Sequence, residues 1–228
     1  MACAYTSRRG GTSEGVLSSL NVSFKAEKEL GADDFEERVL TNRRIAGALV
    51  GADEHWSTIR QVHEAEIVRA PGAGNRPAAD GQWTDDPIDT VAVVSADCVL
   101  CLFIGGKKGD GKIAVAHAGW RGVVAGVVSN AARSIEAHTV YLGPAIGPCC
   151  FEVGPEVVEA FRGRFASSIA EDERHVDLWS AAGSEALRAG VREVFSARIC
   201  TSCHEGLFFS HRRDKGKTGR QALVARLV

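Results

Sequence analysis

The chain has 228 residues, of which 45% are hydrophobic and 25% charged, as in a globular protein large enough to bury a sizeable core. A formal net charge of −2 gives no nucleic-acid or membrane-surface footprint, and no apolar run is long enough to span a membrane. The first ten residues lack the apolar core of a signal peptide and the seven cysteines are odd in number, so we expect a cytoplasmic protein with reduced thiols.

The first predicted element is a helix from about residue 33 to residue 50. Apolar residues recur there at helical spacing, and Asp33 with Glu36 resembles a capping box. A strand over residues 59–70 is predicted next, and it contains the sequence Gln61-Val62-His63.

Residues 71–87 are rich in proline and glycine, and they could be taken for an interdomain linker. The apolar segments on either side are too short to form separate cores, so we predict a long loop within one domain over residues 1–228. The β-branched run over residues 91–104 then predicts a strand that is interrupted at Ala96-Asp97-Cys98.

A βαβ unit is the clearest prediction. It comprises a strand over residues 112–117, a glycine-containing turn over 118–122, a helix over 123–137 and a strand over 139–142. Later segments predict helices around residues 157–165 and 176–190 and short strands at 207–210 and 222–227. Because strands and helices alternate without regular spacing, we expect a mixed α/β layered fold.

Three residues where strands end or break could bind a metal ion: His63, Cys98 and His117. Two imidazoles and one thiolate are a good zinc set, and three protein ligands leave a fourth position for water or substrate. Their separations of 35 and 19 residues mean that only the fold could bring them together, and a lone histidine or cysteine in an apolar strand is more often a packed core residue.

The remaining cysteines give weaker signals. Cys149 and Cys150 are adjacent, an arrangement poorly suited to chelating one ion together, and they follow a turn rich in glycine and proline. Cys200 and Cys203 have CxxC spacing, but no second CxxC and no thioredoxin-like helix accompany them. We therefore assign Cys149 and Cys203 to packing.

The segment over residues 210–220 carries five Lys/Arg residues and two glycines. A solvated surface turn explains it equally well, yet arginine side chains beside glycine backbone also recognise phosphate or carboxylate groups. A second possible anion site lies at residues 117–122, where the start of the predicted helix favours negative charge.

Several motifs together resemble a known family. The strings Gln61-Val62-His63, Ala96-Asp97-Cys98, HAGWRG at 117–122, GPAIGPCCFEVG at 143–154 and FFSHRRD at 208–214 occur in that order. The sequence resembles the YfiH-like, laccase-domain family, historically labelled multicopper polyphenol oxidase and also called peptidoglycan editing factor. Ser18-Ser19-Leu20-Asn21 resembles the family's N-terminal motif, so the resemblance covers nearly the whole chain.

The resemblance implies a single-domain four-layer α/β/β/α sandwich with mixed sheets. It also implies a zinc site on His63, Cys98 and His117, which would serve catalysis as well. The implied chemistry is purine nucleoside phosphorolysis of adenosine, inosine and methylthioadenosine, with adenosine deamination as a second activity. Copper is possible at this site, but seven scattered histidines and a single methionine fit a multicopper oxidase poorly.

On this interpretation the partners are a small nucleoside and phosphate, with no nucleic acid or membrane, and the chain is expected to be a monomer. Arg121, Arg212 and Arg213 are candidates for binding phosphate. Asp97 and Glu152 are candidates for protonating the leaving amine in deamination.

Two other functions fit the same residues. In one, Cys98 is a nucleophile with His117 as its base, in a hydrolase that edits peptidoglycan precursors by removing incorrectly incorporated amino acids. In the other, the chain is a non-catalytic metal- or nucleoside-binding protein that modulates a partner. Measurements of metal content and of adenosine turnover with and without a chelator distinguish these two functions from the zinc-dependent nucleoside enzyme.

Overall fold

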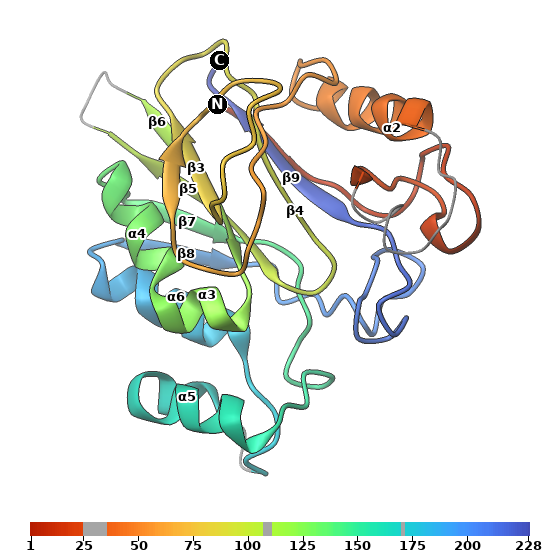
Figure 1. Cartoon of the computed structure of the whole chain (residues 1–228). Coiled ribbons are helices and arrows are strands. Elements are labelled where there is room, and N and C mark those ends of the chain that lie inside the picture. The colour runs from red at the N-terminus through yellow and green to blue at the C-terminus, as the bar shows by residue number, and fades with distance from the viewer. Residues whose placement is uncertain (25–35, 107–110, 170–171) are drawn as a thin grey trace.

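A computed structural model describes residues 1–24, 36–106, 111–169 and 172–228, and its described part is built around two β-sheets (Figure 1). A six-stranded sheet has the order β2-β3-β6-β5-β7-β8, and a three-stranded sheet has the order β1-β9-β4. In chain order the strands are β1 Ala2–Tyr5, β2 Ile67–Arg69, β3 Gly81–Thr84, β4 Val91–Ser95, β5 Val99–Gly105, β6 Lys112–Ala118, β7 Thr139–Leu142, β8 Glu193–Ser196 and β9 Gln221–Arg226.

The described residues contain five α-helices, and four of them cover the outer faces of the sheets (Figure 1). Helix α2 (Glu36–Ala48) lies on the three-stranded sheet, where Ala46 packs with Val224. Helices α3 (Trp120–Ala125), α4 (Val127–Ser134) and α6 (Leu178–Arg188) pack on the six-stranded sheet, and α5 (Pro155–Phe165) lies farther out, against α3 (Figure 1).

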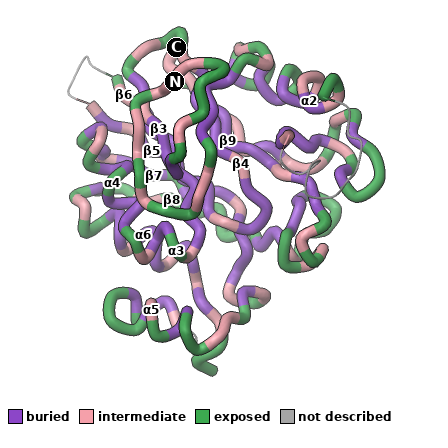
Figure 2. The backbone as a smooth tube through the Cα atoms, in the orientation of Figure 1, coloured by how far each residue is buried: buried purple, intermediate pink, exposed green. Residues whose placement is uncertain are grey.

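Three separate hydrophobic cores hold these layers together, and Figure 2 shows the sheets as the most buried part of the chain. Successive side chains of a strand point to opposite faces of its sheet, so each sheet contributes side chains to two of the three cores. In β5, Leu100 and Leu102 face the core between the sheets, whereas Cys101 and Phe103 face the helices. With one core between each pair of neighbouring layers, the architecture is the α/β/β/α sandwich with mixed sheets that was predicted.

The interruption at residues 96–98 is the point where the chain passes from one sheet to the other. Strand β4 pairs with β9 in the three-stranded sheet, and β5 pairs with β6 and β7 in the six-stranded sheet. Asp97 adopts a positive φ of 102° at this crossover, which a continuous strand would not contain. A break was predicted from the sequence; the change of sheet was not.

The predicted βαβ unit is present, with two differences. Strands β6 and β7 both pair antiparallel with β5, so they run parallel with β5 between them. The helix predicted over 123–137 is two helices, α3 and α4, separated at Gly126. Gly126 has φ 100°, a left-handed conformation that ends one helix and redirects the chain into the next.

Other predicted elements differ from the structure. Within residues 59–70 only β2 is a strand, and the predicted loop over 71–87 contains β3, whose residues Gly81–Thr84 are nearly all buried. Residues 207–210 are irregular in place of a strand, with Leu207 exposed and residues 208–210 buried. The backbone N–H of Phe209 donates to the side chain of Gln221, and no ladder forms. Asp33 of the predicted capping box lies outside the described residues.

Besides β3, two further strands, β1 and β8, were not predicted. Each has four residues, too few for a clear periodic pattern, and each lies at a sheet edge. In the described part of the chain, no helix has the length and apolar character needed to cross a bilayer.

Candidate metal centre

The fold brings His63, Cys98 and His117 into one group, here called the three-ligand site. Each offers one ligand atom, and these atoms all lie within 4.8 Å of one another. His117 is in β6, Cys98 is at the crossover between β4 and β5, and His63 is in the turn before β2. The two imidazole rings are edge to face, with their centroids 4.8 Å apart.

Asp80, which sequence reasoning missed, organises two of the three ligands. Its carboxylate is fully buried, and its Oδ1 accepts from His117 Nδ1 at 2.9 Å. The same carboxylate accepts from the backbone N–H groups of Val62, His63 and Glu64 at 3.1, 3.0 and 2.7 Å. Asp80 therefore fixes both the ring orientation of His117 and the turn that presents His63.

Two backbone features allow the ligands to approach so closely. His63 has φ 64°, the left-handed region that non-glycine residues rarely adopt, and the three hydrogen bonds from its turn to Asp80 support that conformation. Gly119 follows β6, and a Cβ at this position would lie 3.0 Å from Cys98 Sγ and 3.1 Å from His63 Cδ2. A side chain at position 119 would therefore push the ligands apart.

Charge is distributed unevenly among the three ligands. Burial opposes ionisation of Cys98, but the neighbouring imidazoles of His117 and His63 lower the pKa of its thiol to about 6. Burial also opposes protonation of His117, yet the Cys98 thiolate and the Asp80 carboxylate raise the pKa of that imidazole to about 9. The pocket thus favours a thiolate beside positive charge, which a cation can supply in place of a proton.

The donor set fits a metal ion. Since Nδ1 of His117 is engaged by Asp80, Nε2 is left to coordinate, the usual arrangement of a carboxylate–histidine–metal group. One thiolate and two imidazoles suit zinc or copper. His63 is exposed and Cys98 is half-buried, so the fourth coordination position can open toward solvent.

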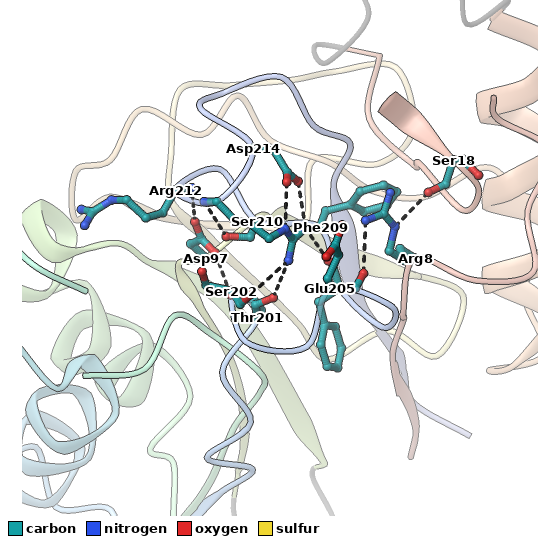
Figure 3. Close-up of polar contacts among 12 residues, drawn as sticks. Arg8, Ser18, Asp97, Thr201, Ser202, Glu205, Phe209, Ser210, Arg212 and Asp214 are labelled. Atoms are coloured by element: carbon teal, nitrogen blue, oxygen red, sulfur yellow. Dashed lines mark hydrogen bonds and ion pairs between the residues drawn. The ribbon is translucent and has the colours of Figure 1, made fainter. Parts of the chain in front are cut away.

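Asp97 has a different role from the one the sequence suggested. Both of its carboxylate oxygens accept hydrogen bonds, Oδ1 from Thr201 Oγ1 at 2.6 Å and Oδ2 from the backbone N–H of Arg212 at 2.7 Å (Figure 3). It therefore links the sheet crossover to two C-terminal loops. Glu152, the other proposed acid, forms an ion pair with Arg174 at the surface.

The three candidate phosphate-binding arginines differ in how their guanidinium groups are used. Arg213 bonds to the Asp214 carboxylate and donates to the carbonyls of Thr201, Ser202 and Phe208, so its donors are engaged. Arg212 Nη1 donates to the Glu152 carbonyl at 2.6 Å. Arg121 stacks on the Trp120 ring, at 4.7 Å from its centroid, and makes no hydrogen bond or ion pair within the described residues.

The structure also brings together four cysteines that sequence reasoning left apart: Cys149, Cys150, Cys200 and Cys203. Cys149 and Cys203 are exposed, so assigning them to packing was wrong. The CxxC spacing was the one signal in the sequence, and its partner pair lies about 50 residues upstream in another loop.

Comparison with known proteins gives matches along the whole chain. A family model described as multi-copper polyphenol oxidoreductase laccase matches residues 2–227. The purine nucleoside phosphorylase YfiH of Escherichia coli is 37% identical over 241 residues, which cover 100% of this chain and 93% of that protein. The purine nucleoside phosphorylase YlmD of Geobacillus stearothermophilus is 34% identical over 242 residues, covering 94% and 86%.

A solved structure agrees with these matches. The crystal structure of a DUF152 protein from Neisseria meningitidis has a TM-score of 0.86 at 33% identity, and the alignment covers 99% of this chain and 93% of that one. Since the family model and these relatives extend over nearly the full length, the chain belongs to the multi-copper polyphenol oxidoreductase laccase family, the YfiH-like family that its motifs resemble.

Proposed function

We propose that this protein is a zinc-dependent purine nucleoside enzyme, in which His63, Cys98 and His117 hold the ion. It would cleave adenosine, inosine and methylthioadenosine with phosphate, and it would deaminate adenosine as a second activity. The observation that carries the proposal is the convergence of the three ligand atoms within 4.8 Å, in a chain whose full-length relatives are named purine nucleoside phosphorylases.

Zinc in this site would supply Lewis acidity and a net positive charge next to the substrate. The work of the protein is to hold that site rigid. Asp80 keeps Nε2 of His117 aimed at the other two ligands, and Gly119 leaves room for them to meet. The exposed face on the His63 side is where a nucleoside would enter.

Phosphorolysis also requires a group that compensates the charge of phosphate. Of the three arginines, Arg121 has the freest guanidinium and lies four residues after His117. Arg212 has one nitrogen committed to the Glu152 carbonyl and retains others. We therefore assign anion binding to Arg121 and then Arg212, with Arg213 mainly supporting its own loop.

The decisive test is the dependence of each reaction on phosphate. Release of free base from adenosine or inosine should require phosphate and accumulate ribose 1-phosphate, whereas deamination of adenosine to inosine and ammonia should proceed without it. Cys98→Ala and His117→Ala should each abolish both activities, and Cys3→Ala, at an exposed cysteine of β1, should retain them. Base release that ignores phosphate would refute the phosphorylase assignment.

A second candidate is favoured by the proximity of Cys98 and His117, whose ligand atoms lie within 4.8 Å, since the imidazole promotes the thiolate form that a nucleophile requires. A Cys–His hydrolase of peptidoglycan precursors should cleave amide bonds after treatment with a chelator, because its chemistry needs no ion. The zinc enzyme should lose turnover under the same treatment and recover it when zinc is added back. A non-catalytic binding protein would bind adenosine stoichiometrically without turning it over.

A further inference from the structure

The four cysteines named above come from two loops that the fold places side by side, and they are called here the four-cysteine cluster. Cys149 and Cys150 lie in the turn after β7, and Cys200 and Cys203 lie in the turn after β8. All four sulfur atoms lie within 4.8 Å of one another, and Cys203 Sγ is 3.5 Å from Cys149 Sγ and 3.4 Å from Cys150 Sγ.

These sulfur–sulfur separations match those of four thiolates that coordinate one tetrahedral ion. With zinc–sulfur bonds of about 2.3 Å, tetrahedral geometry places the sulfurs roughly 3.8 Å apart. A disulfide needs its two sulfurs at about 2.05 Å, so the sulfurs at 3.4 and 3.5 Å are separate thiols. An iron–sulfur cluster of several irons spreads its thiolates over several metal atoms, whereas this set is compact enough to surround one.

The surrounding backbone supports thiolates at this position. The backbone N–H of Gly147 donates to Cys200 Sγ at 3.2 Å, a hydrogen bond to sulfur of the kind that stabilises a metal-bound thiolate. A Cβ on Gly147 would lie 3.3 Å from Cys149 Sγ and 3.3 Å from Cys200 Cβ, so the two loops approach closely at this glycine. The backbone N–H of Ala145 donates to the Ile199 carbonyl, and the backbone N–H of Thr201 donates to the Ala145 carbonyl, which joins the same loops further.

Burial argues that the cluster does not exist for packing. Cys149 and Cys203 are exposed and Cys150 is half-buried, although an unpaired cysteine acting as a small apolar residue is normally buried. Three solvent-facing thiols held against the buried thiol of Cys200 are a costly arrangement unless something binds them. The cluster is also distinct from the three-ligand site, with which it shares no residue.

We propose that the four-cysteine cluster is a second, structural metal site that binds one thiophilic divalent ion, zinc in the ordinary case. The ion would fasten the turn after β7 to the turn after β8. These turns support the basic segment over residues 210–220. Arg212 Nη1 donates to the Glu152 carbonyl, and Arg213 Nη1 donates to the Thr201 carbonyl. Thr201 in turn bonds to Asp97, beside Cys98 (Figure 3).

Metal counting tests this proposal without any assay of activity. Protein purified under reducing conditions with zinc present should contain about two ions per chain. Cys98→Ala should retain about one of them in the four-cysteine cluster, and Cys203→Ser should retain about one in the three-ligand site. Cys3→Ser, a matched exposed cysteine elsewhere, should retain both.

Two further measurements protect the test against misfolded variants. Cobalt bound to Cys98→Ala, which leaves the cluster intact, should show the intense thiolate charge-transfer absorption of a tetrahedral sulfur site. Thiol titration of the native zinc-loaded protein should find the four cysteines protected until a chelator is added. No metal in Cys98→Ala, reaction of the four cluster thiols as well as Cys3 in the zinc-loaded protein, or a mass showing disulfides in reduced preparations would each overturn the proposal.

Discussion

Asp80 shows how much of the three-ligand site depends on a residue that touches no substrate. Its carboxylate accepts four hydrogen bonds, three from the turn carrying His63 and one from His117. Burial alone would raise its pKa, but the hydrogen bonds from His117 and this turn outweigh that effect and keep the pKa below its ordinary value. Asp80 is therefore an ionised, buried positioning residue for His63 and His117.

We predict that Asp80→Asn weakens zinc binding by about 10- to 100-fold, the usual loss when the partner of a metal-bound histidine is changed. The amide has nearly the same shape, but its NH2 group cannot accept the bonds that the second carboxylate oxygen accepts. Competition with a chromophoric chelator measures the change. Asp85→Asn, at a surface carboxylate paired with Arg69, is the control and should bind zinc like the wild type. An unchanged zinc affinity of Asp80→Asn would show that Asp80 does not position the residues of the three-ligand site.

The candidate metal ligands could be selected from the sequence because each was predicted where a strand ends or breaks, which is where a sheet presents functional groups. In the structure His63 lies instead in the turn before β2. Asp80 could not be selected in this way, because its role depends on a turn 16 to 18 residues upstream and a strand 37 residues downstream. The arginines show the same limitation. Charge and glycine content indicated an anion-binding loop, but only the contacts reveal that Arg213 is occupied.

The contacts of the arginines predict different effects for a residue that binds phosphate and for one that stabilises its own loop. Arg121→Gln should reduce phosphate-dependent base release more than deamination, by about 1.5 to 3 kcal/mol in transition-state stabilisation, the usual worth of a hydrogen bond to a charged group. Arg213→Gln should instead lower the thermal midpoint and reduce both activities together, because it removes contacts within the loop. The rates of base release and of deamination, measured with and without phosphate, distinguish these two roles. Equal losses of both activities in Arg121→Gln would contradict its assignment.

Among the elements, those with a long periodic pattern were predicted and those that depend on partners were not. Helices α5 and α6 and strands β5 and β6 have clear apolar patterns. Strand β3 was hidden in a segment read as a loop, because Gly81–Thr84 is short and its pairing with β2 and β6 supplies the order that its composition does not. Strand pairing across distant segments is a tertiary effect that no local window contains.

Helix α6 contains a buried charge that gives a pH-dependent prediction. Glu185 is fully buried; its Oε1 accepts from the backbone N–H of Ser129 and from Arg164, while Oε2 has no partner. Burial raises the pKa of this carboxyl. The folded state therefore binds the proton more tightly than the unfolded state, and stability falls as pH rises from the ordinary glutamate pKa of about 4.3 through the raised value.

Replacing Glu185 with glutamine should remove this cost. We expect Glu185→Gln to raise the free energy of unfolding at neutral pH by on the order of 1 kcal/mol, the scale of an imperfectly satisfied buried group. The gain should shrink as pH falls toward about 4, where the wild-type carboxyl is protonated as well. Urea unfolding across this pH range measures it. Glu156→Gln, at an exposed carboxyl of α5, serves as the control, and a gain independent of pH would contradict the explanation.

At the scale of the whole molecule, the chain passes between the two sheets and contributes elements to all four layers. The N-terminal β1 and the C-terminal β9 pair in the three-stranded sheet, and β4 pairs with β9 before the chain crosses to the six-stranded sheet. Tyr5 Oη donates to the Tyr141 carbonyl at 2.7 Å, which joins β1 directly to β7 across the two sheets. The inner faces of the two sheets cover each other through a shared core, and one domain over residues 1–228 stays a prediction.

If the chain is one domain, both sheets should unfold in a single step. Leu102 is fully buried between them, so Leu102→Ala should lower the free energy of unfolding by about 2 to 5 kcal/mol through lost burial and a cavity. Calorimetry should show one transition in both proteins, with equal calorimetric and van't Hoff enthalpies and a lower midpoint in the variant. Ile88→Ala, at a side chain 83% exposed, should leave the midpoint nearly unchanged. Two resolved transitions, only one of them shifted by Leu102→Ala, would mean that the sheets belong to separate folding units.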